Sequence, residues 1–184
     1  MRRLAALFSG LCLLALAGGL ALLWLPPAFP PAPPPTRPEG AARLSSPVAR
    51  ILIEKSARRM TVFQRDGAPR RFAIALGFAP EGDKTRQGDG RTPEGIFRID
   101  RLNRASAYHL SLGLDYPQAR HREAAREAGQ DPGGDIMIHG QPNQLPEGTR
   151  LAGDWTAGCI AVTNAEIEEI FAHAAIGTRV EILP

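Results

Sequence analysis

Apolar and polar side chains alternate in three short runs near the start of the long folded part of the chain. The runs lie around residues 49–54, 60–64 and 71–76, and the segments KSARR and DGAP separate them. Alternation with a period of two residues is typical of strands that bury one face. Short polar connections between such runs favour neighbouring strands. We therefore predict three strands in a meander.

Four further strands and two helices are predicted downstream of a long loop rich in glycine, proline and charge. The strands are GIFRI, AYHLSLGLDYP, DIMIH and TRVEIL, at residues 95–99, 107–117, 135–139 and 178–183. The alanine-rich, charged segment QARHREAAREAG predicts a surface helix stopped by Gly129. A second helix is expected from Thr163 to about Ala175, because Thr163 and Glu166 have the spacing of a capping box.

These elements favour a mainly-β fold. About seven strands, most of them sequential neighbours, and two helices are typical of a β-sandwich or a partly open barrel. We expect the helices to be accessory elements that decorate the sheet.

Residues 1–25 are predicted to be a transmembrane anchor or a signal segment. Arg2 and Arg3 precede an uncharged, mostly apolar run at residues 4–25, long enough to cross a bilayer as a helix, with the N-terminus in the cytoplasm. The triplet ALA at 15–17 offers a cleavage site, but apolar residues continue beyond it, so we favour an uncleaved anchor. The rest of the chain is then periplasmic, tethered to the inner membrane or, in the alternative, secreted after cleavage.

The remaining chain divides into a linker, residues 26–46, and a domain, residues 47–184. The linker begins with thirteen residues that include eight prolines, which favours an extended polyproline spacer. From residue 47 onward there are 18 Lys and Arg against 18 Asp and Glu, although the whole chain has a net charge of +3. The domain is therefore neutral, and we expect no nucleic-acid partner.

Cys159 is the single cysteine of residues 47–184, so it has no disulfide partner there. A free thiol in an oxidising compartment needs a reason to be retained. Burial as a small apolar side chain is one interpretation. The preceding Gly158 favours another, because it lets the chain turn and bring amide N–H groups near the sulfur, as an oxyanion hole requires. Cys159 is thus a candidate nucleophile.

His139 is the candidate general base that a thiol of ordinary pKa requires. It ends the apolar run DIMI and precedes a glycine, so its imidazole emerges where a loop can form a pocket. His109 either lines the same groove or faces outward. His121 has arginines on both sides and is expected to be solvated, while His173 near the end of the last helix complements the helix dipole. No C-x-x-C or H-x-x-x-H spacing occurs, so we expect no metal and no cofactor.

These residues resemble the catalytic domain of the L,D-transpeptidases, also called YkuD-like, of bacterial cell-wall enzymes. The resemblance extends from Val48 to Leu183. Its most specific parts are IMIHG, then TAGC ending twenty residues after His139, with GDGRTPEGIF upstream. The segment GCIAVTNAEIEEIF is similar to a proteobacterial, YafK-like branch that includes hydrolases releasing lipoprotein from peptidoglycan.

The resemblance implies a function in peptidoglycan chemistry. Cys159 would attack a stem peptide, release D-alanine and form a thioester, with His139 as base and later acid and the amides near Gly158 as the oxyanion hole. An amine of another stem would then give a 3–3 crosslink, water would give a carboxypeptidase, and a lysine of an outer-membrane lipoprotein would give protein anchoring. An amidase-type hydrolase and an inactive cell-wall-binding module of the same fold are the alternatives. A sortase-like enzyme is disfavoured, because the cysteine of this chain comes directly after a glycine and Arg179 is the one arginine between the cysteine and residue 184.

Two positions depart from the family pattern. Many members have Ser-His-Gly-Cys followed two residues later by arginine, whereas this chain has Ala157 and Ala161. How the substrate's charge is recognised is therefore an open question. Residues expected to contact substrate are Gly140, Trp155, Thr156, Tyr116 and His109. For Trp155, packing in the interior is an equal alternative to a place in the groove wall.

Overall fold

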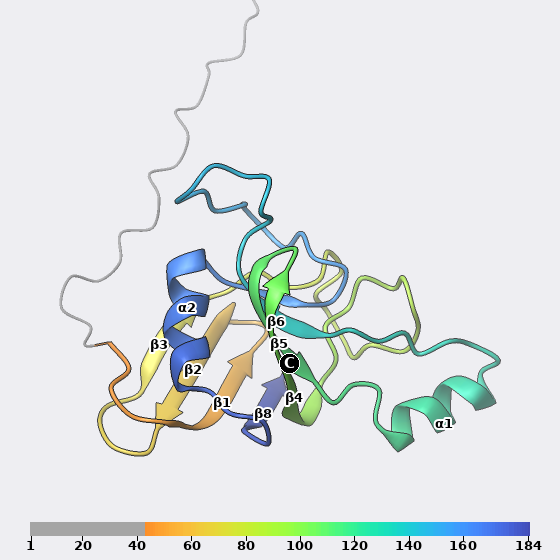
Figure 1. Cartoon of the computed structure of the whole chain (residues 1–184). Coiled ribbons are helices and arrows are strands. Elements are labelled where there is room, and N and C mark those ends of the chain that lie inside the picture. The colour runs from red at the N-terminus through yellow and green to blue at the C-terminus, as the bar shows by residue number, and fades with distance from the viewer. Residues whose placement is uncertain (1–42) are drawn as a thin grey trace, which may run out of the picture. The chain divides into compact units, whose positions relative to one another are not determined.

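A single sheet of eight strands organises residues 43–184, the part of the chain that the computed structural model describes (Figure 1). The strands are β1 Val48–Glu54, β2 Arg59–Gln64, β3 Arg70–Ala73, β4 Gly95–Ser106, β5 His109–Leu114, β6 Met137–His139, β7 Ile160–Ala161 and β8 Arg179–Leu183. The helices are α1 Ala119–Glu127 and α2 Asn164–His173. The predicted anchor and most of the predicted linker lie outside the described residues. Within residues 43–184, neither helix is long and apolar enough to cross a membrane.

The strands follow the order β3-β2-β1-β8-β4-β5-β6-β7. The antiparallel β1–β2 and β2–β3 pairs confirm the predicted meander. β8 inserts between β1, to which it is parallel, and β4, to which it is antiparallel. Just after β3, Ala75 exchanges two backbone hydrogen bonds of 2.8 and 2.9 Å with Ala161 of β7. This bridge curves the sheet toward closure, so the fold is a half-barrel and not a two-sheet sandwich.

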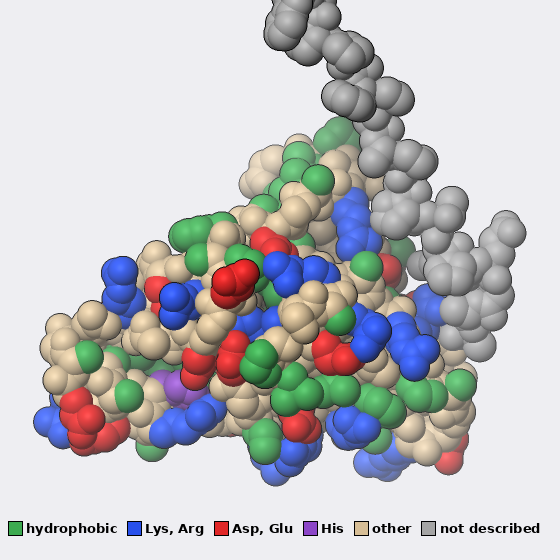
Figure 2. Space-filling view, turned by 180° about the vertical axis from the view of Figure 1, so that it is seen from behind, with side chains coloured by type: hydrophobic (Ala, Val, Ile, Leu, Met, Phe, Trp, Pro, Cys, Tyr) green, Lys and Arg blue, Asp and Glu red, His purple; other side chains and the backbone are tan. Residues whose placement is uncertain are grey.

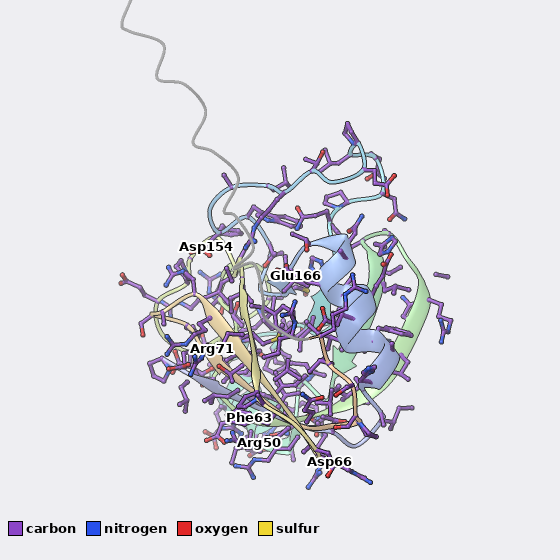
Figure 3. The ribbon with its side chains drawn as sticks, turned by 90° about the vertical axis from the view of Figure 1, so that its left-hand side faces the viewer. Arg50, Phe63, Asp66, Arg71, Asp154 and Glu166 are labelled. Atoms are coloured by element: carbon purple, nitrogen blue, oxygen red, sulfur yellow. The ribbon has the colours of Figure 1, made fainter. Side chains whose placement is uncertain are left out.

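The meander shows why alternation specifies these strands. Ile51 and Ile53 of β1 and Met60 and Val62 of β2 are fully buried in the core. On the outer face, the Arg50 guanidinium stacks at 3.5 Å over the Phe63 ring (Figure 3). The face that carries these four residues therefore packs in the core, whereas Arg50 and Phe63 lie on a partly exposed face.

Helix α2 is part of the core, so the expectation that both helices are accessories is wrong for α2. The predicted capping box is present: Thr163 Oγ1 accepts from the Glu166 amide, and the Glu166 carboxylate accepts from the Thr163 amide. Ile167, Ile170 and Phe171 on one face are buried, and the helix packs on β5 and β6. An apolar face at helical spacing thus covers the strands that carry the candidate base.

Helix α1 is a surface helix, as predicted, but its His121 is not solvated. His121 is 8% exposed and stacks on Phe97 at 5.7 Å between ring centroids. Its Nδ1 accepts from the amide of Gln118 at the start of the helix. The first-turn position turns the imidazole inward against the sheet, which the flanking arginines in the sequence do not reveal.

Several strands differ from the sequence expectation, most of all β4, β5 and β7. β4 continues to Ser106, seven residues beyond the predicted end, and β5 starts only at His109 because Ala107 and Tyr108 form the turn between them. The two-residue β7 was not predicted. On the face seen in Figure 2, basic and acidic side chains are interspersed, in line with the neutral composition of the domain.

Candidate active site

Cys159 and His139 flank a pair of residues in register between β6 and β7. In the parallel pair β6–β7, Ile138 lies opposite Ile160, and both side chains are fully buried in the core. Cys159 comes one residue before Ile160, and His139 one residue after Ile138. Because side chains alternate along a strand, this register predicts that both point away from the core isoleucines. One strand spacing and two residues of rise place their Cα atoms about 8 Å apart, a separation that the two side chains can bridge.

The His139 ring is held in the orientation that a general base needs. Its Nδ1 lies 2.7 Å from the Gly140 carbonyl oxygen. A carbonyl only accepts, so Nδ1 carries the proton and Nε2 keeps its lone pair. Tyr108 and Trp155 pack on the ring, with centroids at 4.5 and 5.7 Å. The candidate base is therefore fixed in both tautomer and rotation.

The surroundings of the two side chains favour their neutral forms. Burial raises the pKa of the Cys159 thiol above 9.0, assisted by the charge of Asp135, while a hydrogen bond from the Met137 backbone and the charge of Lys84 act in the opposite direction. Burial lowers the pKa of His139 below 6.5, with the bond to Gly140 opposing. The pair is thus a thiol and a neutral imidazole at pH 7, and the sulfur becomes a thiolate only as the base removes its proton.

The acid limb of the pH–activity profile is expected to lie below pH 6.5. The reaction needs neutral His139, and burial lowers its pKa, so the neutral form persists as pH falls through 6.5 and is lost only below it. The rate of acyl-enzyme formation between pH 4.5 and 8 measures this limb. A midpoint at or above 6.5 would contradict the assigned environment of His139.

The turn before the cysteine is built by Thr156. Its hydroxyl donates to the Cys159 carbonyl oxygen at 2.8 Å and accepts from the Gly158 amide at 3.1 Å. Thr156 is itself buried, so it supports the turn from inside. The Gly158 amide already has a partner in Thr156, and stabilising an oxyanion would require that bond to open. The oxyanion role of Gly158 stays a prediction.

The other residues expected to contact substrate lie in different surroundings. Trp155 packs on His139, and its buried Nε1 has no hydrogen-bond partner among the described residues. Tyr116 is buried, donates its hydroxyl to the Pro132 carbonyl oxygen at 2.9 Å and packs on His121, and burial raises its pKa to about 12. The structure therefore places Trp155 beside the candidate base and Tyr116 in a separate packing cluster.

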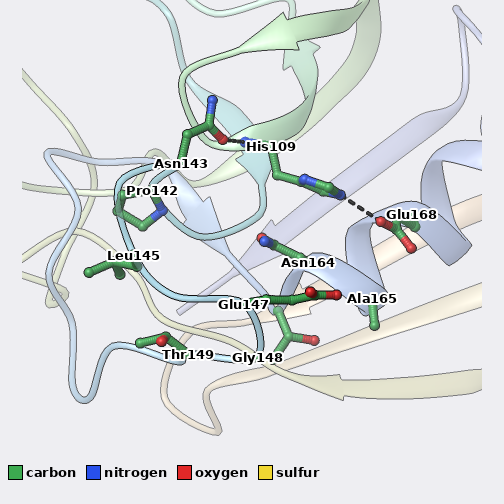
Figure 4. A pocket seen from close by; sticks show the side chains of 11 residues that line it. His109, Pro142, Asn143, Leu145, Glu147, Gly148, Thr149, Asn164, Ala165 and Glu168 are labelled. Carbon is green, nitrogen blue, oxygen red and sulfur yellow. Dashed lines mark hydrogen bonds and ion pairs between the residues drawn. The ribbon is translucent and has the colours of Figure 1, made fainter.

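His109 lines a separate cavity of about 630 Å³ between the β4–β5 turn, residues 142–149 and the start of α2 (Figure 4). Its Nε2 lies 2.6 Å from Glu168 Oε1, and its backbone has a positive φ of 68°. Neither Cys159 nor His139 lines this cavity. His109 is thus near the His139 loop without facing the candidate nucleophile.

Sequence reasoning missed several residues of the site. The Gly140 carbonyl orients the base, Tyr108 packs on it, and the Asp135 carbonyl oxygen accepts from Cys159 Sγ at 3.3 Å. Backbone carbonyls leave no residue-type signal in a sequence. Tyr108 does have such a signal, because it is an aromatic residue in a predicted strand, next to His109.

Comparison with known proteins gives one family. The model of the L,D-transpeptidase catalytic domain family, YkuD, matches residues 48–182. YafK of Escherichia coli K12 is 34% identical over 92 residues, which are 49% of this chain and 30% of YafK. The crystal structure of the helical cell shape determining protein Pgp2 from Campylobacter jejuni matches with a TM-score of 0.56 and 29% identity, over 74% of this chain and 48% of that chain.

A second solved structure supports the fold alone. Bd1075 of Bdellovibrio bacteriovorus matches with a TM-score of 0.50 and 22% identity, over 75% of this chain and 48% of that chain. In each of these comparisons the matched region is less than half of the relative's own length.

Proposed function

Because the chain belongs to the L,D-transpeptidase catalytic domain family, we propose that it is a cysteine-dependent L,D-transpeptidase that acts on peptidoglycan stem peptides. The observation that supports the proposal is the register of β6 and β7, in which Cys159 and His139 flank the Ile138–Ile160 pair, with the imidazole oriented by the Gly140 carbonyl. A partly exposed thiol beside a neutral, oriented imidazole is the arrangement of a base-activated nucleophile.

The proposed acylation step is a displacement at the carbonyl of the third stem residue. His139 Nε2 takes the proton from Sγ as the sulfur bonds to the carbonyl carbon, which gives a tetrahedral oxyanion. The carbon–nitrogen bond then breaks, His139 returns the proton to the departing amine, and D-alanine leaves. The product is a thioester on Cys159.

The proposed second step transfers the acyl group to an amine. His139 takes a proton from the acceptor amine as it attacks the thioester, the carbon–sulfur bond breaks, and the proton returns to the sulfur. With a second stem peptide the product is a 3–3 crosslink, and with a lysine of an outer-membrane lipoprotein it is an anchored protein. Water as acceptor makes the same site an L,D-carboxypeptidase.

The proposal includes the rest of the chain. Residues 1–25 would hold the protein at the inner membrane, or direct its secretion, and residues 26–46 would extend the domain of residues 47–184 into the periplasm. Substrate would lie along the face that carries His139, where Trp155 is the predicted contact that packs on the base. Gly140, Thr156, Tyr116 and His109 would shape the surrounding loops.

The experiment is incubation of the full chain with a disaccharide tetrapeptide, with and without an added diamino-acid acceptor. We expect release of D-alanine, a protein mass increased by the acyl group, and an acceptor-dependent transfer product. Release of D-alanine with the tripeptide as the sole product would identify a hydrolase. Absence of both D-alanine and the acylated protein would contradict the proposal and favour a cell-wall-binding module.

A further inference from the structure

A row of residues in register leads from the candidate nucleophile to an arginine. Arg101 of β4 lies opposite Gly113 of β5, and Gly113 lies opposite Met137 of β6. β7 begins at Ile160, opposite Ile138, and Cys159 just before it accepts a hydrogen bond from the Met137 backbone, which extends the row to the cysteine. Paired residues share a face of a sheet. Arg101 therefore starts from the same face as Cys159 and His139.

Gly113 allows the Arg101 side chain to lie across the sheet toward the cysteine. A Cβ atom at Gly113 would lie 2.6 Å from Asp100 Oδ1, 3.1 Å from Arg101 Cβ and 3.2 Å from Arg101 Nε. The guanidinium thus passes over the position where a side chain of β5 would stand. It ends 3.0 Å from Asp135 Oδ1.

Asp135 contacts both the guanidinium and the sulfur. Its carboxylate contacts Arg101 Nη2, and its carbonyl oxygen accepts from Cys159 Sγ at 3.3 Å. The Arg101 and Asp135 side chains are 50% and 80% exposed. A pair this exposed contributes little to stability, so a carboxylate of a ligand can replace that of Asp135 at small cost.

We propose that Arg101 is a specificity-determining residue that binds the free carboxylate of the residue that leaves. This inference rests on the proposed function. In a stem tetrapeptide, the terminal carboxylate is only three bonds from the carbonyl carbon that the sulfur attacks. Asp135 links the guanidinium to the sulfur, so a peptide bound at Cys159 would lie near Arg101, whose planar donors suit a carboxylate. Arg101 would supply the charge that Ala161 lacks at the position where many family members have arginine.

The test compares two substrates that differ only at that carboxylate: the disaccharide tetrapeptide and its C-terminal amide. The full chain is expected to cleave the free acid with a kcat/KM about 10- to 100-fold higher than that of the amide. This factor corresponds to the free energy that a hydrogen bond to a charged group contributes. In Arg101→Ala and Arg101→Gln, kcat/KM for the acid should fall by about the same factor. Cleavage of the amide should stay unchanged, which also reports that both variants are folded. Arg101→Lys should recover part of the preference.

Arg71→Ala is the matched control, because Arg71 is an exposed arginine on β3, opposite Thr61 of β2 (Figure 3). It should leave both substrates unaffected. An equal fall for acid and amide, or no fall for the acid in either Arg101 variant, would overturn the inference while the proposed function stands. If the unaltered chain cleaves neither substrate, the proposed function fails, and the role of Arg101 fails with it.

Discussion

Replacing Cys159 by alanine is expected to abolish acylation and to lower D-alanine release by about 10⁴-fold or more. The thioester forms on Sγ, and alanine has no atom that can replace it. The variant would retain substrate binding and any oxyanion stabilisation, and these can promote only direct attack by water on the peptide carbonyl. The hydrogen bond from Sγ to the Asp135 carbonyl is a weak sulfur contact at 3.3 Å, so the variant should fold. Intact-protein mass spectrometry and a D-alanine assay measure the two losses.

Two further variants separate chemistry from structure in this prediction. Cys159→Ser keeps the shape of the side chain but has a far poorer nucleophile, and should lose activity nearly as completely. Cys12→Ala removes the other cysteine of the chain and should retain full activity and acylation. D-alanine release at the unaltered rate by Cys159→Ala would refute the role of the thiol and, with it, the proposed mechanism.

The strands were predictable because one face of each is apolar. The alternation in residues 49–64 corresponds to Ile51, Ile53, Met60 and Val62 in the core, and the box formed by Thr163 and Glu166 marks the start of α2. Local spacing is sufficient for such features, since they depend on neighbours along the chain.

The placement of the site depended on pairing between distant segments. His139 at a strand end and Gly158 before Cys159 identified the candidates, but a parallel β7 of only two residues brings them to one face. A strand this short has no detectable period. The row to Arg101 also follows a bulge between Ile99 and Arg101, which changes the face on which the arginine lies, and a bulge has no reliable pattern in a single sequence.

Burial by tertiary contacts explains the two wrong expectations. His121, which lies between arginines, was expected to be solvated, and the helix after Thr163 was expected to be an accessory element. His121 is buried by Phe97 and Tyr116, and α2 by its packing on β5 and β6. The position of the sheet decides which helix residues become buried, and the neighbours of a residue along the sequence do not.

Substitution of Gly158 by alanine is expected to destabilise the domain by about 3 kcal/mol or more and to eliminate activity. Gly158 has a φ of 136°, where side chains are strained by about 1–3 kcal/mol. A Cβ there would also lie 2.6 Å from the Arg91 carbonyl oxygen. That atom is backbone, so relieving the clash means moving the loop away from Cys159, at a cost of about 1–3 kcal/mol. Urea unfolding of Gly158→Ala and of the unaltered protein measures the difference in the free energy of unfolding.

The matched control is Gly153→Ala in the same loop. Gly153 also has a positive φ, 69°, but a Cβ there meets nothing within 4 Å, so only the conformational cost of about 1 kcal/mol applies. Activity should survive this change, since the turn that presents Cys159 is not displaced. Equal destabilisation by the two substitutions would show that backbone conformation alone accounts for the glycine before the cysteine. A larger loss at Gly158 would mean that close approach of the Arg91 carbonyl fixes the turn that presents the thiol.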